Sequence, residues 1–365
     1  MKLRNLVLTL HGSIGILIGL LLVVISLTGS AIVFHQELDR ALNPSLMRVV
    51  PQAQQLSIDT ILAPVQAAYP DLPLQFIRVP QTSEQTYQVT MTNPDGQRLE
   101  TFVNPYTGEV LGSRTWERSL VGFLYTLHHQ LFIGKVGEMI VGITGLLLLL
   151  IAITGVILWT GWRKLATGFK IRSQAPRQLL IYDIHKVGGI LSSIFLLIIA
   201  FSGVFIVGFI LLSQLNQTPK TEQALLTPQP SVALRELLRK ADAAMPDGKT
   251  TLVMFSEDEP QKITVHKKLP QDSPRFALSS VELDRYRGEV LKVDKVVEPP
   301  PKFKILIAFG SLHFGLFGGL PTRILYVFIG LMPTVLLITG LVMWKRRREL
   351  KARRKAALLL AKQTQ

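Results

Sequence analysis

Residues 5–36 read NLVLTLHGSIGILIGLLLVVISLTGSAIVFHQ, 32 consecutive positions without Asp, Glu, Lys or Arg. A transmembrane helix needs about 20 predominantly apolar residues, so this run is long enough to cross a bilayer. It is too long for the apolar part of a signal peptide, and no clear small-residue cleavage site follows it. Three further uncharged runs cover residues 139–162, 187–212 and 324–344. The sequence therefore predicts an α-helical integral membrane protein with four spans.

The composition of the whole chain agrees with membrane spans and restricts the chemistry. Hydrophobic residues make up 48% of the 365 positions and charged residues only 18%, with a mean hydropathy of +0.33. Soluble domains are usually more highly charged. The chain has no cysteine, which excludes disulfides, iron–sulfur clusters, thiolate-ligated haem and covalently attached haem.

The basic residues are placed asymmetrically along the chain. Seventeen of them lie before the first run, between the second and third runs, or after the fourth, against two acidic residues in the same segments. That balance equals the whole net charge of +15, because the remaining 23 basic and 23 acidic residues cancel. The positive-inside rule then predicts that both termini and the loop between the second and third runs are cytoplasmic. Anionic lipid of the bilayer explains the basic tail better than nucleic acid does, and we expect no nucleic-acid partner.

These runs and charges divide the chain into eight segments. The predicted transmembrane helices are residues 1–36, 136–162, 185–213 and 322–344, with a cytoplasmic loop at 163–184 and a basic cytoplasmic tail at 345–365. Residues 37–135 and 214–321 are predicted to lie in the periplasm. Each of these outer segments reads as α+β, with a helix over 57–68 or 231–244. The predicted strands cover residues 74–79, 87–92 and 99–103 in the first segment and 251–255, 262–266 and 275–283 in the second.

The two halves of the chain resemble each other without gaps. Ile153-Thr154-Gly155 recurs 185 positions later as Ile338-Thr339-Gly340, and Leu127-His128 recurs as Leu312-His313. In the first and third runs, a histidine lies 18 residues before the glycine of a Thr-Gly or Ser-Gly pair. Both halves start on the same side, so we predict two parallel repeats related by an axis along the membrane normal. A residue that occurs once in each half can meet its counterpart near that axis.

Six of the seven histidines lie at predicted membrane boundaries, where an ionisable side chain is costly and usually functional. His11 and His185 occupy matching positions about two helical turns inside the cytoplasmic ends of their spans. His128 and His313 match each other before the second and fourth spans. His129 and His35 are matched by phenylalanines, and the seventh histidine, His266, is expected on a surface strand.

Two neutral imidazoles that face each other from different helices in an apolar pocket can ligate a b-type haem. We therefore expect His11 with His185 to form an inner site and His128 with His313 an outer site, each holding the iron of one haem b. His129 and His35 are weaker candidates. Small residues near the ligands would let a flat macrocycle approach the backbone; they are Gly12, Gly15, Gly188 and Gly189.

Other interpretations of these histidines remain open. A single interfacial histidine is often only hydrogen-bonded or lipid-facing. Zinc is less well supported, because the chain has no H-E-x-x-H motif and the pairs lie at opposite ends of the spans. A proton relay would normally use buried carboxylates, and the spans carry none between their ends. The sequence also has no P-loop and no dinucleotide fingerprint, so electrons from inside would come from a quinol or a partner protein.

Two stretches of the outer segments resemble a known family. Residues 102–111, FVNPYTGEVL, and residues 281–291, VELDRYRGEVL, are similar to the end of a PepSY domain, where a strand and a Gly turn precede Glu-Val-Leu. Together with the Leu-His motifs and the four spans, they make the chain resemble PepSY-associated transmembrane (PepSY_TM) proteins of bacterial inner membranes. The resemblance extends over nearly the whole chain.

The resemblance implies a function. Some members of the family are iron-regulated, haem-containing reductases that reduce ferric siderophores in the periplasm, and His11, His185, His128 and His313 match the membrane histidines of the family. The implied partner is a ferric siderophore or another ferric chelate. PepSY domains elsewhere are linked to peptidase inhibition, so a non-enzymatic protein that binds a peptide, a protease or a transporter is the alternative. A transporter subunit is the weakest interpretation, because the spans lack buried charges.

Overall fold

The computed structural model describes residues 2–215, 232–256, 259–270, 279–296 and 301–363. The chain folds into two compact units. The helical unit comprises Met1–Phe34, Leu124–Asn216 and Ile305–Gln365, and the sheet unit comprises His35–Phe123 and Gln217–Lys304.

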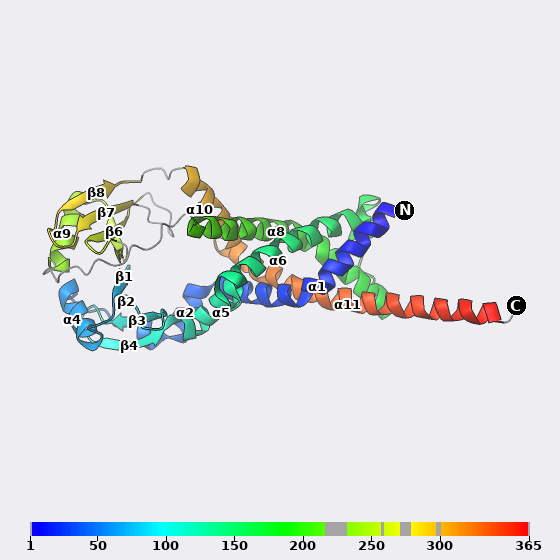
Figure 1. Ribbon diagram of the computed structural model, residues 1–365, viewed down its shortest axis with the longest axis horizontal. Helices are drawn as coiled ribbons and strands as arrows, with labels where there is room; N and C mark the ends of the chain where they lie inside the picture. Colours follow the sequence, from blue (N-terminus) through cyan, green and yellow to red (C-terminus); the bar gives the residue numbers. More distant parts are fainter. Residues whose placement is uncertain (1, 216–231, 257–258, 271–278, 297–300, 364–365) are drawn as a thin grey trace. The chain divides into compact units, whose positions relative to one another are not determined.

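Four long helices form most of the helical unit (Figure 1): α1 (Lys2–Ile32), α6 (Gly134–Leu158), α8 (Arg177–Leu215) and α11 (Leu320–Gln363). By length and composition, each contains a segment able to cross a membrane. These segments are Leu3–Ile32, Gly134–Trp162, Arg177–Ser213 and Leu320–Ala357. The four predicted spans are confirmed as apolar helices, and α11 continues well beyond its apolar part into the basic tail.

The four long helices pack as a closed ring. Helix α1 packs against α6 and α11, and helix α8 packs against the same two neighbours. Helices α1 and α8 therefore lie on a diagonal of the bundle. Inward-facing side chains of α1 and α8 can approach each other across its centre.

Short helices precede two of the long ones. Helix α5 (Leu120–Gln130) leads into α6, and α10 (Pro301–His313) leads into α11. Between α5 and α6 the backbone turns sharply, because Leu131 and Phe132 adopt left-handed conformations with φ of 50° and 60°. Two of the predicted haem ligands, His128 and His313, lie on these short helices and not on the spans.

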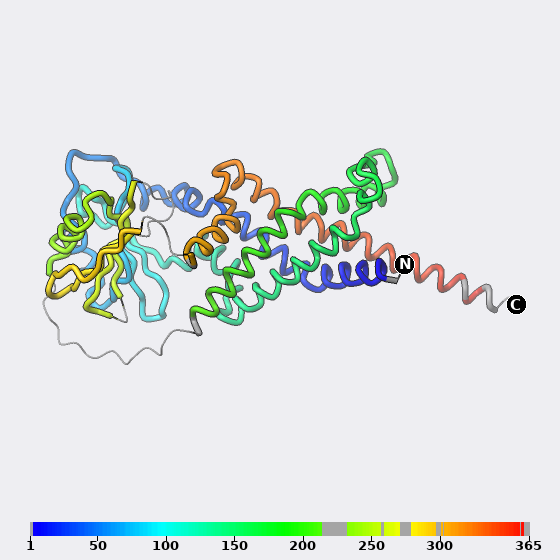
Figure 2. Tube along the Cα trace, turned by 90° about the horizontal axis from the view of Figure 1, so that it is seen from above, coloured from blue at the N-terminus to red at the C-terminus, as the bar shows by residue number. Residues whose placement is uncertain are grey.

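The α6–α8 connection is held in place by a buried carboxylate. It contains η2 (Thr160–Trp162) and α7 (Leu165–Phe169). Asp183, fully buried, accepts hydrogen bonds from the Arg172 side chain at 2.8 and 2.9 Å and from Lys186 Nζ at 3.1 Å. Within the helical unit, this connection and both chain termini lie at the same end (Figures 1 and 2). The three segments with the excess of basic residues therefore share one end of the bundle.

The sheet unit contains a single eight-stranded antiparallel sheet with the order β4-β3-β2-β1-β5-β6-β7-β8. Its first four strands are β1 (Leu74–Arg78), β2 (Tyr87–Thr92), β3 (Arg98–Val103) and β4 (Val110–Thr115). The other four are β5 (Lys249–Phe255), β6 (Lys262–Lys268), β7 (Ser279–Asp284) and β8 (Val290–Asp294).

The two outer segments join through their first strands. Ile77 of β1 pairs with Val253 of β5 at the centre of the sheet, and both side chains are fully buried. Sequence analysis expected two separate α+β domains. Each four-stranded half would leave β1 or β5 as an open edge, and pairing these edges satisfies their backbone groups. The result is one continuous sheet with one hydrophobic core.

Two helices complete the core of this sheet. Helix α4 (Ile58–Ala68) begins at Ser57, whose Oγ accepts the Thr60 N–H, and α9 (Leu234–Ala244) is its counterpart in the second half. Both contribute side chains to the core, such as Ile61 and Leu237, which pack with strand residues. The prediction missed β4 and β8. The expected strand at 275–283 and the helix start at residue 231 lie partly outside the described residues.

The beginning of the sheet unit is tied to the sheet by buried ions. Helix α2 (His35–Leu42) is followed by α3 (Pro44–Met47), and η1 (Trp116–Arg118) follows β4. Arg114 of β4 holds Asp39 of α2 with two bonds of 2.7 and 2.6 Å, and its Nε donates to Glu100 of β3 at 2.9 Å. Gln88 donates to the other Glu100 oxygen at 2.6 Å. The paired acceptors compensate the cost of burying the guanidinium.

Candidate functional site

The inner pair of histidines meets across the diagonal of the bundle. His11 comes from α1 and His185 from α8, and their ring centroids are 6.2 Å apart with an interplanar angle of 86°. The packing of the four long helices brings the two rings together in an edge-on arrangement.

The outer pair forms in the same way from the short helices. His128 of α5 and His313 of α10 have ring centroids 6.2 Å apart and an interplanar angle of 47°. The structure thus brings each predicted pair together at the same separation.

Hydrogen bonds fix the tautomer of the inner rings. His11 Nδ1 lies 3.2 Å from the Ile151 carbonyl oxygen, and because a carbonyl can only accept, Nδ1 carries the proton. His185 Nδ1 lies 2.8 Å from Thr339 Oγ1. That hydroxyl already donates its hydrogen to the Val335 carbonyl at 2.7 Å, so it accepts from His185.

The outer rings are held by the same kind of bond. His128 Nδ1 donates to the Ile25 carbonyl at 2.8 Å, and His313 Nδ1 donates to the Ile199 carbonyl at 3.0 Å. Each ring also lies near one hydroxyl oxygen, at 3.4 Å for Thr28 and 3.3 Å for Ser202.

In all four rings, Nε2 is therefore the unprotonated nitrogen, with its lone pair available to a ligand. A metal-binding histidine usually donates its other N–H to a carbonyl in this manner, which sets its tautomer and orientation. A histidine nitrogen binds a metal ion at about 2.0–2.1 Å and lies about 1.1 Å from the centroid of its own ring. Two rings that bind one ion from opposite sides would therefore have centroids about 6.3 Å apart. The observed 6.2 Å in both pairs fits an ion between the rings.

Each histidine rests on a glycine that follows the hydroxyl residue. A Cβ added at Gly29 would lie 2.8 Å from His128 Cε1, and one added at Gly203 would lie 2.9 Å from His313 Cε1. At the inner pair, the corresponding distances are 3.3 Å from Gly155 to His11 and 3.5 Å from Gly340 to His185. We call these four dipeptides the Ser/Thr-Gly pairs: the hydroxyl orients a ring and the glycine leaves room for it. They are Thr28-Gly29, Thr154-Gly155, Ser202-Gly203 and Thr339-Gly340.

The remaining histidines are not part of either pair. His129 turns back to its own helix, with Nδ1 2.7 Å from the Tyr125 carbonyl and its ring tilted by 55° against the Tyr125 ring. His35 begins α2 in the sheet unit. His266 lies on β6, with Nε2 3.2 Å from Met254 Sδ.

The glycines expected to admit a macrocycle differ between the two inner helices. No atom lies within 4 Å of a Cβ built on Gly12 or Gly15 of α1. On α8, a Cβ on Gly188 would meet Met332 at 2.8 Å, and one on Gly189 would meet Leu336 at 3.7 Å. Open space near the backbone is therefore found on the α1 side of the inner pair.

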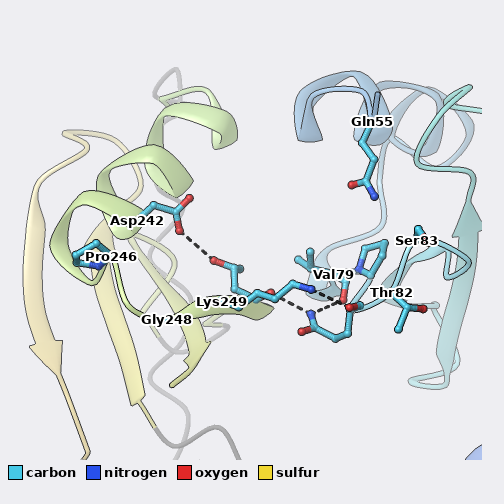
Figure 3. A pocket seen from close by; sticks show the side chains of 11 residues that line it. Gln55, Val79, Thr82, Ser83, Asp242, Pro246, Gly248 and Lys249 are labelled. Carbon is cyan, nitrogen blue, oxygen red and sulfur yellow. Dashed lines mark hydrogen bonds between the residues drawn. The ribbon is translucent and has the colours of Figure 1, made fainter. Parts of the chain in front are cut away.

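The sheet unit contains a pocket of about 510 Å³ (Figure 3). It lies where the two halves of the sheet meet, between the connection after β1 and the turn before β5. Lys249 Nζ donates to the Gln81 carbonyl at 2.7 Å, and the Gln81 amide donates to the Val79 and Thr250 carbonyls at 2.9 and 3.0 Å. Asp242 is its acidic residue. The pocket is lined by amide and hydroxyl side chains, by the basic Lys249 and by the acidic Asp242, a lining that suits a polar ligand or a peptide.

Sequence reasoning found the four paired histidines but not what orients them. The Thr-Gly and Ser-Gly dipeptides were visible as marks of the repeat, and their constant spacing was the available signal. Their contact with a histidine of another helix depends on the packing of the bundle, which the local sequence does not reveal.

Comparison with known protein families gives one match. The family described as PepSY-associated TM region matches residues 8–347, which include most of each of the four apolar segments and all four paired histidines. No curated protein matches the sequence. Four apolar helices and this match make the protein a multi-pass membrane protein, and the chain belongs to the PepSY-associated TM region family.

Proposed function

We propose that the protein carries electrons across the inner membrane through two b-type haems and reduces ferric siderophores, or other ferric chelates, in the periplasm. His11 and His185 would hold the inner haem, and His128 and His313 the outer one. The observation that carries this proposal is the shared state of the four rings: each donates from Nδ1, and the rings face each other in pairs at 6.2 Å.

The number of ligands favours haem over zinc. Structural and catalytic zinc sites use three or four protein ligands. Among the residues that the structure describes, no group of three or more His, Asp or Glu side chains could hold a metal. Two opposed imidazoles instead complete the coordination of an iron that already has four macrocycle nitrogens.

The residues around each pair would perform simple tasks. The Ile151, Ile25 and Ile199 carbonyls hold the ring protons on Nδ1. The apolar helices exclude water from the rings. His11 and Ile25 are 14 residues apart on α1, so the two sites are separated by about 21 Å along the helix. When bound, such haems would supply reversible one-electron exchange between ferric and ferrous iron at two depths of the membrane.

The direction of transfer follows from the proposed topology. We place the termini and the α6–α8 connection in the cytoplasm, because these basic segments share one end of the helical unit. The paired sites are part of two parallel repeats, and the sheet unit represents two PepSY-like halves in the periplasm. A quinol or a partner protein would donate electrons to the inner site.

The acceptor follows from coordination chemistry and from the family resemblance. Siderophore oxygens are hard donors that strongly favour ferric iron. One electron converts the bound Fe³⁺ to Fe²⁺, which the same oxygens hold weakly and exchange quickly. Reduction at the outer site would therefore release the metal from its chelate without breaking any covalent bond of the chelator.

The direct test is a reduced-minus-oxidised visible spectrum of the detergent-purified protein, with haem quantified as its pyridine complex. We expect two b-type haems per chain, and one after His11→Ala or His313→Ala. His129→Ala and His35→Ala are matched controls that should keep both. A ferric siderophore added to the reduced protein in liposomes should oxidise it and yield ferrous iron that a coloured chelator captures. Protein that lacks haem when produced in haem-replete cells would refute the proposal.

The pocket of the sheet unit favours the second candidate function, a binding module for a peptide or protein. Its lining of amide, hydroxyl and charged side chains, with Gln55, Thr82 and Ser83 among them, suits a hydrogen-bonding ligand and includes no cysteine or histidine. This function predicts that cells depend on Lys249 and Asp242 but tolerate His185→Ala. The electron-transfer proposal predicts the reverse.

A further inference from the structure

In the described part of the helical unit, two hydrogen-bond donors on buried aromatic side chains have no partner. They are the Trp159 indole nitrogen Nε1 and the Tyr326 hydroxyl. Trp159 is 8% exposed and Tyr326 only 3%. Leaving a buried donor unsatisfied costs about 1–3 kcal/mol, so such groups in folded proteins usually meet a water or a ligand.

Trp159 follows the inner site along the chain, and its ring packs on the α6–α8 connection. It directly follows α6, one turn after Gly155, the glycine on which His11 rests. Its ring is fixed on several sides, because a Cβ on Gly161 or Gly168 would come within 2.2 or 2.5 Å of it. The Trp162 and Phe169 rings also pack on it, with centroids 5.3 and 5.1 Å away. The indole therefore cannot rotate freely to find water.

Tyr326 lies beside the outer histidines. Its ring packs on Gly315, two residues after His313, where an added Cβ would lie 2.8 Å from Tyr326 Cγ. The rings of Phe317 and Phe195 also pack on it, with centroid distances of 5.9 and 6.4 Å. Phe195 is one turn before Ile199, whose carbonyl orients His313. Two elements that hold the outer ring thus also hold Tyr326.

Neither donor has a buried counterpart at the matching position in the other half of the chain. The position that matches Trp159 is Trp344, whose ring is 40% exposed and packs against the Arg348 guanidinium. The position that matches Tyr326 is Val141. Another unpartnered hydroxyl of the helical unit, that of Thr334, can rotate toward the carbonyls of its own helix. An indole or a phenol has no such choice.

We infer that Trp159 and Tyr326 each donate a hydrogen bond to a carboxylate of the haem held by the neighbouring histidine pair. The inference rests on the proposed function, because it requires haem at both pairs. Haem carries two carboxylates on its edge, and a buried carboxylate needs donors. A positive charge also lies nearby at the outer site, where Arg323 precedes Tyr326 by one turn and donates to the Val33 carbonyl at 2.9 Å.

The test measures haem midpoint potentials in variants that retain a single haem. His185→Ala leaves the outer haem and His128→Ala leaves the inner one. A donor to the carboxylate weakens its negative field at the iron, so removing the donor lowers the potential. We expect Tyr326→Phe to lower the outer potential and Trp159→Phe the inner one. The expected three- to tenfold change in the oxidised-to-reduced ratio corresponds to about 28–59 mV for a one-electron couple.

The crossed combinations serve as controls. Tyr326→Phe should leave the inner potential unchanged, and Trp159→Phe the outer potential. Trp344→Phe and Tyr182→Phe, at partly exposed positions, should change neither. Resonance Raman bands of the haem carboxylates should shift only in the two matched combinations.

The outcomes distinguish the inference from the function on which it rests. A protein without haem would overturn both. Two haems per chain, with the potentials and the carboxylate bands unchanged in both phenylalanine variants, would overturn this inference alone and show that water satisfies the two donors. A change of potential without a change in the carboxylate bands would also overturn it.

Discussion

The four glycines of the Ser/Thr-Gly pairs should respond differently to one added methyl group. A Cβ at Gly203 would lie 2.9 Å from His313 Cε1, whereas one at Gly340 would lie 3.5 Å from His185 Cε1. Carbon atoms make their best contact at about 3.5–4.0 Å, so the first methyl overlaps with the ring and the second only touches it. The His313 ring cannot yield without loss, since its Nδ1 is bonded to the Ile199 carbonyl.

The expected size of the effect follows from this overlap. Overpacking a well-packed site costs about 1–3 kcal/mol, which corresponds to about 5- to 150-fold weaker retention of the outer haem. Gly203→Ala should therefore lower the haem content from two toward one per chain, and Gly29→Ala should do the same. Gly340→Ala should retain both haems, because alanine also favours a helix over glycine by about 0.5–1 kcal/mol.

The assay is haem content per chain after detergent extraction and one gel-filtration step, together with the reduced spectrum. Gly155→Ala, with a distance of 3.3 Å, should lie between the two extremes. Equal losses in Gly203→Ala and Gly340→Ala would refute the reasoning, and so would full haem content in all four variants.

Four further predictions concern ligand choice, the sheet unit, which is the subject of two of them, and topology. His128→Ala should remove one haem per chain and His129→Ala should remove none, because it is His128 that faces His313. If haem quantification shows the reverse, His129 is the ligand. Arg114→Ala should destabilise the sheet unit by about 3–5 kcal/mol, since it leaves two buried carboxylates without their cation, and thermal unfolding of the full chain in detergent would measure this. Burial raises the pKa of Glu100 despite the attraction of Arg114, so folding favours the protonated carboxyl. The free energy of unfolding should therefore fall as the pH rises from the pKa of Glu100 in the unfolded chain through its pKa in the folded protein. Unfolding measured across this pH range should show no such fall in Glu100→Gln. Because the chain has no cysteine, Asp95→Cys and Lys351→Cys each introduce a single thiol for a membrane-impermeant reagent. Asp95→Cys should react in cells whose outer membrane is permeable and whose inner membrane is intact. Lys351→Cys should react only after lysis.

The helical unit was largely predictable because its signals are local. Uncharged runs define the spans, and the repeat identifies which histidines correspond. The pairing of β1 with β5 was not predictable in the same way, because it joins strands about 175 positions apart through backbone hydrogen bonds that favour no particular side chain. Short strands such as β8, whose side chains are mostly exposed, also lack the alternation that marks a half-buried strand. The Ser/Thr-Gly pairs are an intermediate case: their spacing was visible, but their purpose appears only when a ring from another helix rests on them.

Under the proposed function, cofactor binding and helix assembly would depend on each other, because each histidine is bonded to a helix other than its own. His11 of α1 bonds to α6, and His185 of α8 bonds to α11, so each inner ring is anchored on a neighbouring helix before it faces its partner across the diagonal. The outer rings are anchored in the same way, His128 to α1 and His313 to α8. A ligand between the rings of a pair would add a direct link between the two halves of the chain, beside bonds such as that of Arg323 to the Val33 carbonyl. Losing the inner ligand would then loosen α1 against α8, and a haem-free variant should be more sensitive to proteolysis at the α6–α8 connection than at the sheet.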